Sequence, residues 1–155
     1  MGKALCAAHY AEPRARRLAE REFNLSWSDR LPEGNRTVEG RFWTPQASGA
    51  DAGISMEQGI ATTLGVKIGD RLTFDAGGAR VTAPVTSLRK VDWESFRVNF
   101  FALFAPGALD GLPTTYIAAF RAPEGNGSWL TGLVQRYPNI LAIDDVMSLV
   151  LSLSL

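Results

Sequence analysis

Asp70-Arg71-Leu72-Thr73-Phe74-Asp75 and Arg80-Val81-Thr82-Ala83-Pro84-Val85-Thr86 are the two segments that decide the fold. Both have the composition of strands, and Gly77-Gly78 stands between them, which is typical of antiparallel strands joined by a tight turn. Pro84 has no backbone N–H for a sheet ladder, so it indicates an edge strand or a bulge at that point. We therefore expect a β-hairpin near the middle of the chain.

A short helix is predicted just before this hairpin. Ser55-Met56-Glu57-Gln58 fits a capping box, in which the Ser55 hydroxyl accepts from the Gln58 amide and the Gln58 side chain reaches back. Gly65 is placed to cap the helix after about Leu64. Residues 31–53 are rich in proline and glycine, and we interpret them as loops around a short apolar piece.

Further strands and a second helix are predicted after the hairpin. The strands are Asn99–Phe104, Thr114–Phe120 and Ile140–Ile143. The helix starts at Ser128 and ends before Pro138, with an apolar stripe made of Trp129, Leu130, Leu133, Val134 and Tyr137. Strands and helices do not alternate strictly, so the pattern favours the α+β class: a small, β-rich mixed sheet or partial barrel with two or three packing helices.

The two ends of the chain are less regular. Residues 1–12 predict a flexible leader, followed by a helical stretch over Pro13–Glu22. Residues 146–155 form an uncharged apolar tail whose alternation fits a strand, although a stub of a longer segment fits as well. We expect a single domain over 13–145.

Composition excludes several kinds of function. The 155 residues carry 16 basic and 16 acidic side chains, and a zero net charge argues against nucleic acid as a partner. One cysteine, Cys6, and one histidine, His9, are too few for a zinc site, and we expect no metal and no cofactor in this chain. No window approaches the roughly 20 apolar residues that span a bilayer.

Asp92 and Glu94 are the pair of carboxylates that deserves a test as a catalytic site. In an extended segment they would face the same side, as in a glycosidase-like hydrolase. The alternative is a charged, solvated edge with Trp93 pointing to the core from the opposite face. We favour this alternative and expect no catalytic residues.

Aromatic residues gather in the segment from Trp93 to Phe101. They are Trp93, Phe96, Phe100 and Phe101, interleaved with charged residues. If Phe100 and Phe101 lie in one strand, they point to opposite faces, and one of them leaves the core. The segment predicts either an apolar groove that contacts a lipid or a partner chain, or ordinary core packing.

Several strings along the chain carry a resemblance to a known family: Arg21-Glu22-Phe23-Asn24-Leu25-Ser26-Trp27, Leu31-Pro32, Val38-Glu39-Gly40-Arg41-Phe42-Trp43, Ser55-Met56-Glu57-Gln58-Gly59-Ile60-Ala61, Leu64-Gly65-Val66-Lys67-Ile68-Gly69-Asp70, Ser87-Leu88-Arg89-Lys90-Val91-Asp92-Trp93-Glu94-Ser95-Phe96, Asn99-Phe100-Phe101, Pro138-Asn139 and Ile143-Asp144. With these strings the sequence resembles the extracytoplasmic part of bacterial ABC-transporter permeases of the FtsX/MacB-like superfamily, in a branch linked by name to lysophospholipase. The resemblance covers roughly Ala19–Asp145 and departs from the family pattern at Asp144-Asp145-Val146.

This resemblance implies a fragment of a membrane protein that is not an enzyme. The domain would lie on the periplasmic side of the inner membrane and couple ATP-driven helix motion to export of a lipid or lipoprotein. It would reach the membrane through segments that this chain lacks, and ATP would bind to a separate cytoplasmic subunit. The alternatives are the Asp92–Glu94 hydrolase and a free-standing ligand-binding module.

Overall fold

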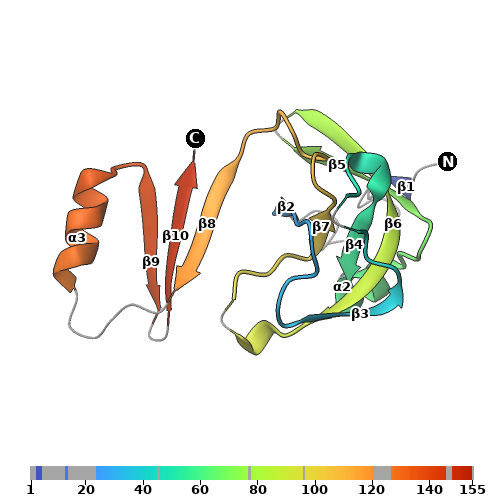
Figure 1. Ribbon diagram of the computed structural model, residues 1–155, viewed down its shortest axis with the longest axis horizontal. Helices are drawn as coiled ribbons and strands as arrows, with labels where there is room; N and C mark the ends of the chain where they lie inside the picture. Colours follow the sequence, from blue (N-terminus) through green and yellow to red (C-terminus); the bar gives the residue numbers. More distant parts are fainter. Residues whose placement is uncertain are drawn as a thin grey trace. The chain divides into compact units, whose positions relative to one another are not determined.

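The computed structural model describes residues 3–4, 13, 24–44, 46–76, 78–95, 97–120, 127–145 and 148–154 (Figure 1). The chain divides into two compact units, Met1–Asp92 with Asn99–Leu112, and Trp93–Val98 with Pro113–Leu155. Beyond Pro13, the helix predicted over Pro13–Glu22 lies outside the described residues. The domain limits predicted from the sequence stay predictions.

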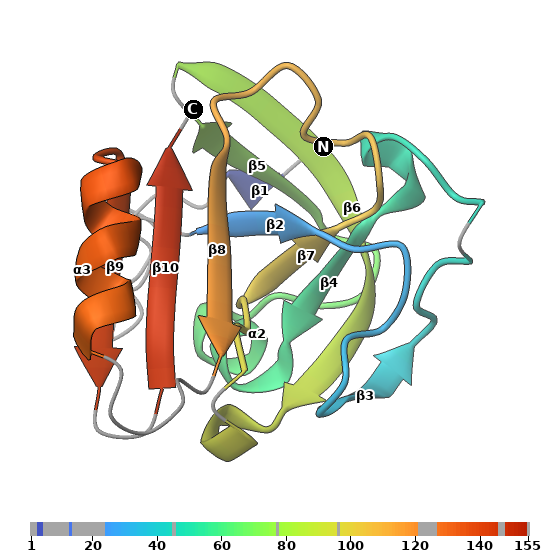
Figure 2. The same ribbon diagram turned by 60° about the vertical axis from the view of Figure 1, so that its left-hand side comes forward.

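Within the described residues, the first unit is built on a mixed sheet of seven strands in the order β1-β5-β6-β4-β7-β2, with β3 added on β6. Three of the strand pairs are parallel, namely β1 with β5, β2 with β7 and β4 with β6. Figure 2 shows β6 as one long, curved strand of this sheet. The predicted α+β class is confirmed. The strands are β1 (Lys3–Ala4), β2 (Leu25–Trp27), β3 (Asn35–Gly40), β4 (Ile54–Glu57), β5 (Arg71–Ala76), β6 (Ala79–Val91) and β7 (Ala102–Phe104).

The predicted hairpin is confirmed as β5 and β6, which pair antiparallel from Arg71↔Pro84 to Ala76↔Ala79. Pro84 lies where the pairing of β6 changes. The β5 ladder ends there, and the β4 ladder begins at Val85 with a register irregularity. A residue without an N–H is tolerated at such a break in the ladder.

The start of the helix differs from the predicted capping box. Ser55 and Met56 belong to strand β4, and helix α2 (Gln58–Leu64) begins only after Glu57. The Glu57 carboxylate caps it by accepting from the N–H groups of Gly59 and Ile60, both at 2.8 Å. Ser55 is instead fully buried. The predicted end is confirmed, because Gly65 adopts the left-handed conformation with φ 62°.

Replacing Glu57 by alanine is expected to lower the free energy of unfolding by about 1 kcal/mol, because two amide donors of the first turn lose their acceptor. Gln58→Ala is the matched control, since Gln58 is exposed and alanine suits a helix. Urea unfolding of both variants measures the difference. If Gln58→Ala costs more than Glu57→Ala, the cap is the one predicted from the sequence and not Glu57.

Two strands lie in or next to the region that was interpreted as loops. The interpretation is wrong for β3, which pairs antiparallel with the far end of β6, and β2 was not predicted at all. β3 contains a register irregularity between Thr37 and Glu39, and most of its side chains are exposed. In addition, the strand predicted from Asn99 begins only at Ala102.

The core of the first unit consists of two apolar clusters among the described residues. In the larger one, Phe104 is 0% exposed, and its ring meets Phe74 edge-on with the centroids 5.7 Å apart. A ring buried to this extent contributes about 2–3 kcal/mol. The smaller cluster is formed by Trp43, Leu103 and Ala105. The larger cluster also holds Ile54, Met56, Ile60, Ala61, Leu64, Val66, Leu72, Val81, Ala83, Val85, Leu88 and Ala102.

The second unit, as far as it is described, has a three-stranded antiparallel sheet in the order β8-β10-β9 and a helix beside β9 (Figure 1). The predicted helix is confirmed as α3, although of its apolar stripe Val134 and Tyr137 are exposed, and the side chain of Trp129 lies outside the description. The tail forms the central strand, β10. The elements are η3 (Trp93–Ser95), β8 (Thr115–Phe120), α3 (Gly127–Arg136), β9 (Ile140–Asp145) and β10 (Ser148–Ser154).

Candidate contact surface

The candidate site is the stretch from residue 93 to residue 101, which we call the contact segment. It follows β6 directly and leads into β7. Its first residues, Trp93–Ser95, form a 3₁₀ turn rather than an extended strand. A 3₁₀ turn closes within three residues, so the backbone is not extended there.

The four aromatic residues predicted to form the contact surface are in different surroundings. Trp93 is 48% exposed, so the expectation that it points into the core is wrong. Phe100 is half-buried against the smaller cluster, and Phe101 is half-buried against the larger one. Phe96 lies outside the described residues. The structure therefore presents Trp93 to solvent and uses Phe100 and Phe101 for packing, while their role in contacts stays a prediction.

The residues at both ends of the contact segment are hydrogen-bonded to the first unit. Where the segment leaves β6, the Asp92 N–H donates to the Gly34 carbonyl at 2.9 Å. Where it returns, the Phe101 carbonyl accepts from the Glu57 N–H at 2.7 Å. The two ends are consequently fixed to the loop before β3 and to the end of β4. The chain that leads into and out of Trp93–Val98 is therefore fixed within the first unit.

Arg89 is the residue at this site that the sequence did not reveal. Its side chain is 0% exposed, at the far end of β6. Nη1 donates to Asn35 Oδ1 at 2.8 Å, and Nη2 donates to the Phe100 carbonyl. Burial lowers the pKa of Arg89 to about 10, and the nearby Glu57 carboxylate opposes this shift. Arg89 therefore remains a cation at neutral pH.

The Asp92–Glu94 pair does not have the geometry on which the hydrolase alternative depends. Strand β6 ends at Val91, before Asp92, and Glu94 lies in the 3₁₀ turn, so the alternation that would place both carboxylates on one face of a strand is absent. Both side chains are exposed. Among the described residues, no group of three or more acidic, histidine or cysteine side chains is placed to hold a metal ion.

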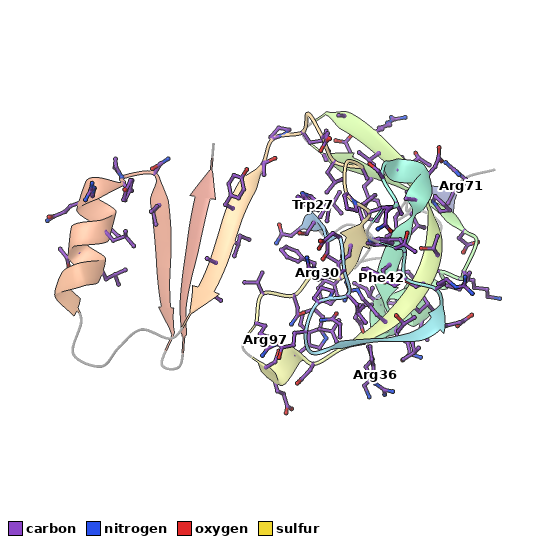
Figure 3. All side chains as sticks on the ribbon, in the orientation of Figure 1. Trp27, Arg30, Arg36, Phe42, Arg71 and Arg97 are labelled. Atoms are coloured by element: carbon purple, nitrogen blue, oxygen red, sulfur yellow. The ribbon has the colours of Figure 1, made fainter. Side chains whose placement is uncertain are left out.

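An open apolar groove of about 530 Å³ lies elsewhere on the first unit. Phe42 and Trp43 form part of its wall, with their ring centroids 4.0 Å apart, and Ile68 and Val85 line it as well. Figure 3 marks Phe42 on this unit. Since no residue of the contact segment lines this groove, it is not the one predicted from the sequence.

The described chain is of the α+β class, and its contact segment carries an exposed tryptophan. A comparison with curated protein sequences points in the same direction as the resemblance, namely to ABC transporter permeases. The chain is 45% identical over 124 residues, 80% of its length, to the protein named "Uncharacterized ABC transporter permease YbbP" of Escherichia coli (strain K12).

The chain spans only 15% of the length of this relative and fits a segment of it. Neither a family model nor a solved structure matches the chain. Among the helices that the structure describes, none is long and apolar enough to cross a bilayer. The resemblance to an ABC transporter permease is thus confirmed as a similarity between this chain and part of such a protein.

Proposed function

We propose that this chain is the periplasmic part of a FtsX/MacB-like ABC transporter permease in the bacterial inner membrane. It couples ATP-driven motion of the membrane helices to export of a lipid or lipoprotein, and it catalyses no reaction. The observation that carries the proposal is the identity of 45% with one segment of a permease. ATP binds to a separate cytoplasmic subunit, and the membrane helices belong to other parts of the permease.

The build of the first unit supports this role. A domain that passes motion on must keep its shape, and the long strand β6 ties β5, β3 and β4 into one sheet. The contact segment then offers Trp93 at the surface of the module, and tryptophan is the side chain most enriched at the energetic centres of interfaces. Trp93 is accordingly the residue through which we expect a partner surface to be engaged.

Trp93→Ala is expected to lower the ATP turnover of the full-length permease with its ATP-binding subunit, reconstituted in lipid nanodiscs, several-fold. The melting temperature of the domain should change by less than about 2 °C, since an exposed side chain supports little packing. Phe101→Ala should mainly lower the melting temperature, because Phe101 packs on the core.

Trp27→Ala is the matched control for this experiment. Trp27 is 55% exposed on the edge strand β2 (Figure 3), so its loss also removes an exposed indole but not one in the contact segment. ATP turnover should remain unchanged in this variant. An equal loss of turnover for Trp27→Ala and Trp93→Ala, or no loss for either, would remove the support for Trp93 as a contact residue.

A further inference from the structure

A polar network joins three parts of the chain at the end of the contact segment, just before β7. Arg89 on β6 donates to Asn35 on β3 and to the carbonyl of Phe100. Asn35 in turn donates through Nδ2 to Asn99 Oδ1 at 2.9 Å, which fixes the residue just before Phe100. The buried guanidinium of Arg89 therefore connects strands β6 and β3 with residues Asn99–Phe101, which we call the stem of the contact segment.

Stability alone does not explain a cation at this place. Arg89 is 0% exposed, and its Nε has no hydrogen-bond partner among the described residues. Removing a charge from water costs several kcal/mol, and well-packed apolar residues often stabilise such positions as well or better. By contrast, a planar guanidinium donates in fixed directions, so it can set the relative placement of two acceptors on different chain segments.

We propose that Arg89 is the positioning residue of the contact segment. Its Nη1 and Nη2 donors lock the Asn99–Phe101 stem against β3, and this lock limits the conformations open to the short chain between β6 and the stem. The proposal deepens the proposed function and rests on it for the role of that chain in contacts. Arg36, the neighbour of Asn35 on β3, points away into solvent (Figure 3) and takes no part in the network.

Amide hydrogen exchange in the full chain tests the lock directly. In Arg89→Met, a side chain of similar length fills the site without donors. We expect the amides of Glu57 and Asp92, which donate to the Phe101 and Gly34 carbonyls, to exchange at least about tenfold faster, while those of β5 and α2 keep their protection. Arg89→Lys keeps the positive charge but lacks the planar guanidinium with its two Nη donors. The same amides should therefore also exchange faster in this variant. Arg36→Met, an exposed change next to Asn35, should leave all these amides unaltered.

Unchanged exchange at Glu57 and Asp92 in a folded Arg89→Met protein would overturn the proposal, as would full protection of these amides in Arg89→Lys. If Arg89→Met does not fold, Asn99→Ala takes its place, because it removes the side-chain link to Asn35 and leaves Arg89 intact. The same faster exchange is expected, and unchanged exchange would again overturn the proposal. ATP turnover of the permease gives the second readout. Faster exchange in Arg89→Met together with normal ATP turnover would count against the proposed function alone. Unchanged exchange together with normal ATP turnover would count against the role of Arg89.

Discussion

Replacing Arg89 by alanine is expected to lower the free energy of unfolding by about 3–5 kcal/mol, one of the largest losses for any single change in the described chain. The side chain is fully buried, so alanine leaves a cavity where the guanidinium stood. It also leaves the acceptors on Asn35 and Phe100 without their donor. Each buried acceptor that is left unpaired adds about 1–3 kcal/mol to the cost.

Urea unfolding at neutral pH measures this loss, and Lys90→Ala is the matched control. Lys90 is the next residue on β6 and is exposed, so its removal should change the free energy of unfolding by less than about 0.5 kcal/mol. A loss below about 1 kcal/mol in Arg89→Ala would mean that Arg89 is hydrated rather than buried. The network at the stem would then contribute little to the folded state.

The same burial gives the sign of a pH effect. Burial lowers the pKa of Arg89 to about 10 in the folded chain, so above pH 10 the unfolded chain binds this proton more tightly than the folded one. The contribution of Arg89 to stability therefore rises as the pH increases above about 10. Below that pH, Arg89 is charged in both states and contributes no slope, which is why the unfolding experiments are set at neutral pH.

The second large effect is expected at Gly40. Gly40 has φ +72°, and a Cβ at this position would overlap the Thr86 carbonyl oxygen, which accepts from the Arg41 N–H at 3.0 Å. Because the obstacle is backbone in the middle of β6, neither side can move without breaking the β3–β6 ladder. Gly40→Ala should consequently lower the free energy of unfolding by about 3 kcal/mol or more.

Gly69→Ala separates the two causes of this loss. Gly69 has φ +88°, but no atom lies within 4 Å of the place where its Cβ would be. Alanine there meets only the left-handed backbone strain of about 1–2 kcal/mol. Thermal and urea unfolding of both variants should show the larger loss for Gly40→Ala. Equal losses would show that β3 does not approach β6 as closely as the structure indicates.

The parts of the fold that the sequence predicts correctly are those with a local signal. The β5–β6 hairpin has a glycine turn between two strand-like segments, and α2 ends at a left-handed glycine, Gly65. Strands β8 and β9 and helix α3 also carry their own periodicity and breaks. In each of these cases the residues that form the element are neighbours in the sequence, so pattern and structure agree.

The parts that the sequence misses depend on distant partners. Strand β3 is polar and mostly exposed, and it becomes a strand only because Asn35 pairs with Val91 on β6. Ser55 fits a cap by spacing, but pairing of β4 with β6 extends the strand through Glu57 and moves the cap there. Tertiary pairing overrides local preference in both cases.

The candidate site was predicted in the same uneven way. The aromatic composition of the contact segment indicated Trp93 as a contact residue, and Trp93 is exposed. The same composition did not indicate that Phe100 and Phe101 pack on two different clusters. Arg89 and Lys90 are adjacent in the sequence, and no local pattern distinguishes the buried side chain from the exposed one. The burial of Arg89 results from β3, β4 and the stem closing around it, which no local pattern encodes.

The proposed function requires that this chain lies on the periplasmic side of the membrane. The most direct test uses a full-length permease in which every native cysteine, Cys6 included, is replaced by serine and Ala79→Cys supplies a single thiol, which is labelled with a membrane-impermeant maleimide on intact bacterial spheroplasts. Ala79 is exposed in the hairpin, so the introduced thiol is accessible in the folded domain. We predict full labelling without permeabilisation. Labelling that appears only after the membrane is permeabilised would place the chain in the cytoplasm and contradict the account.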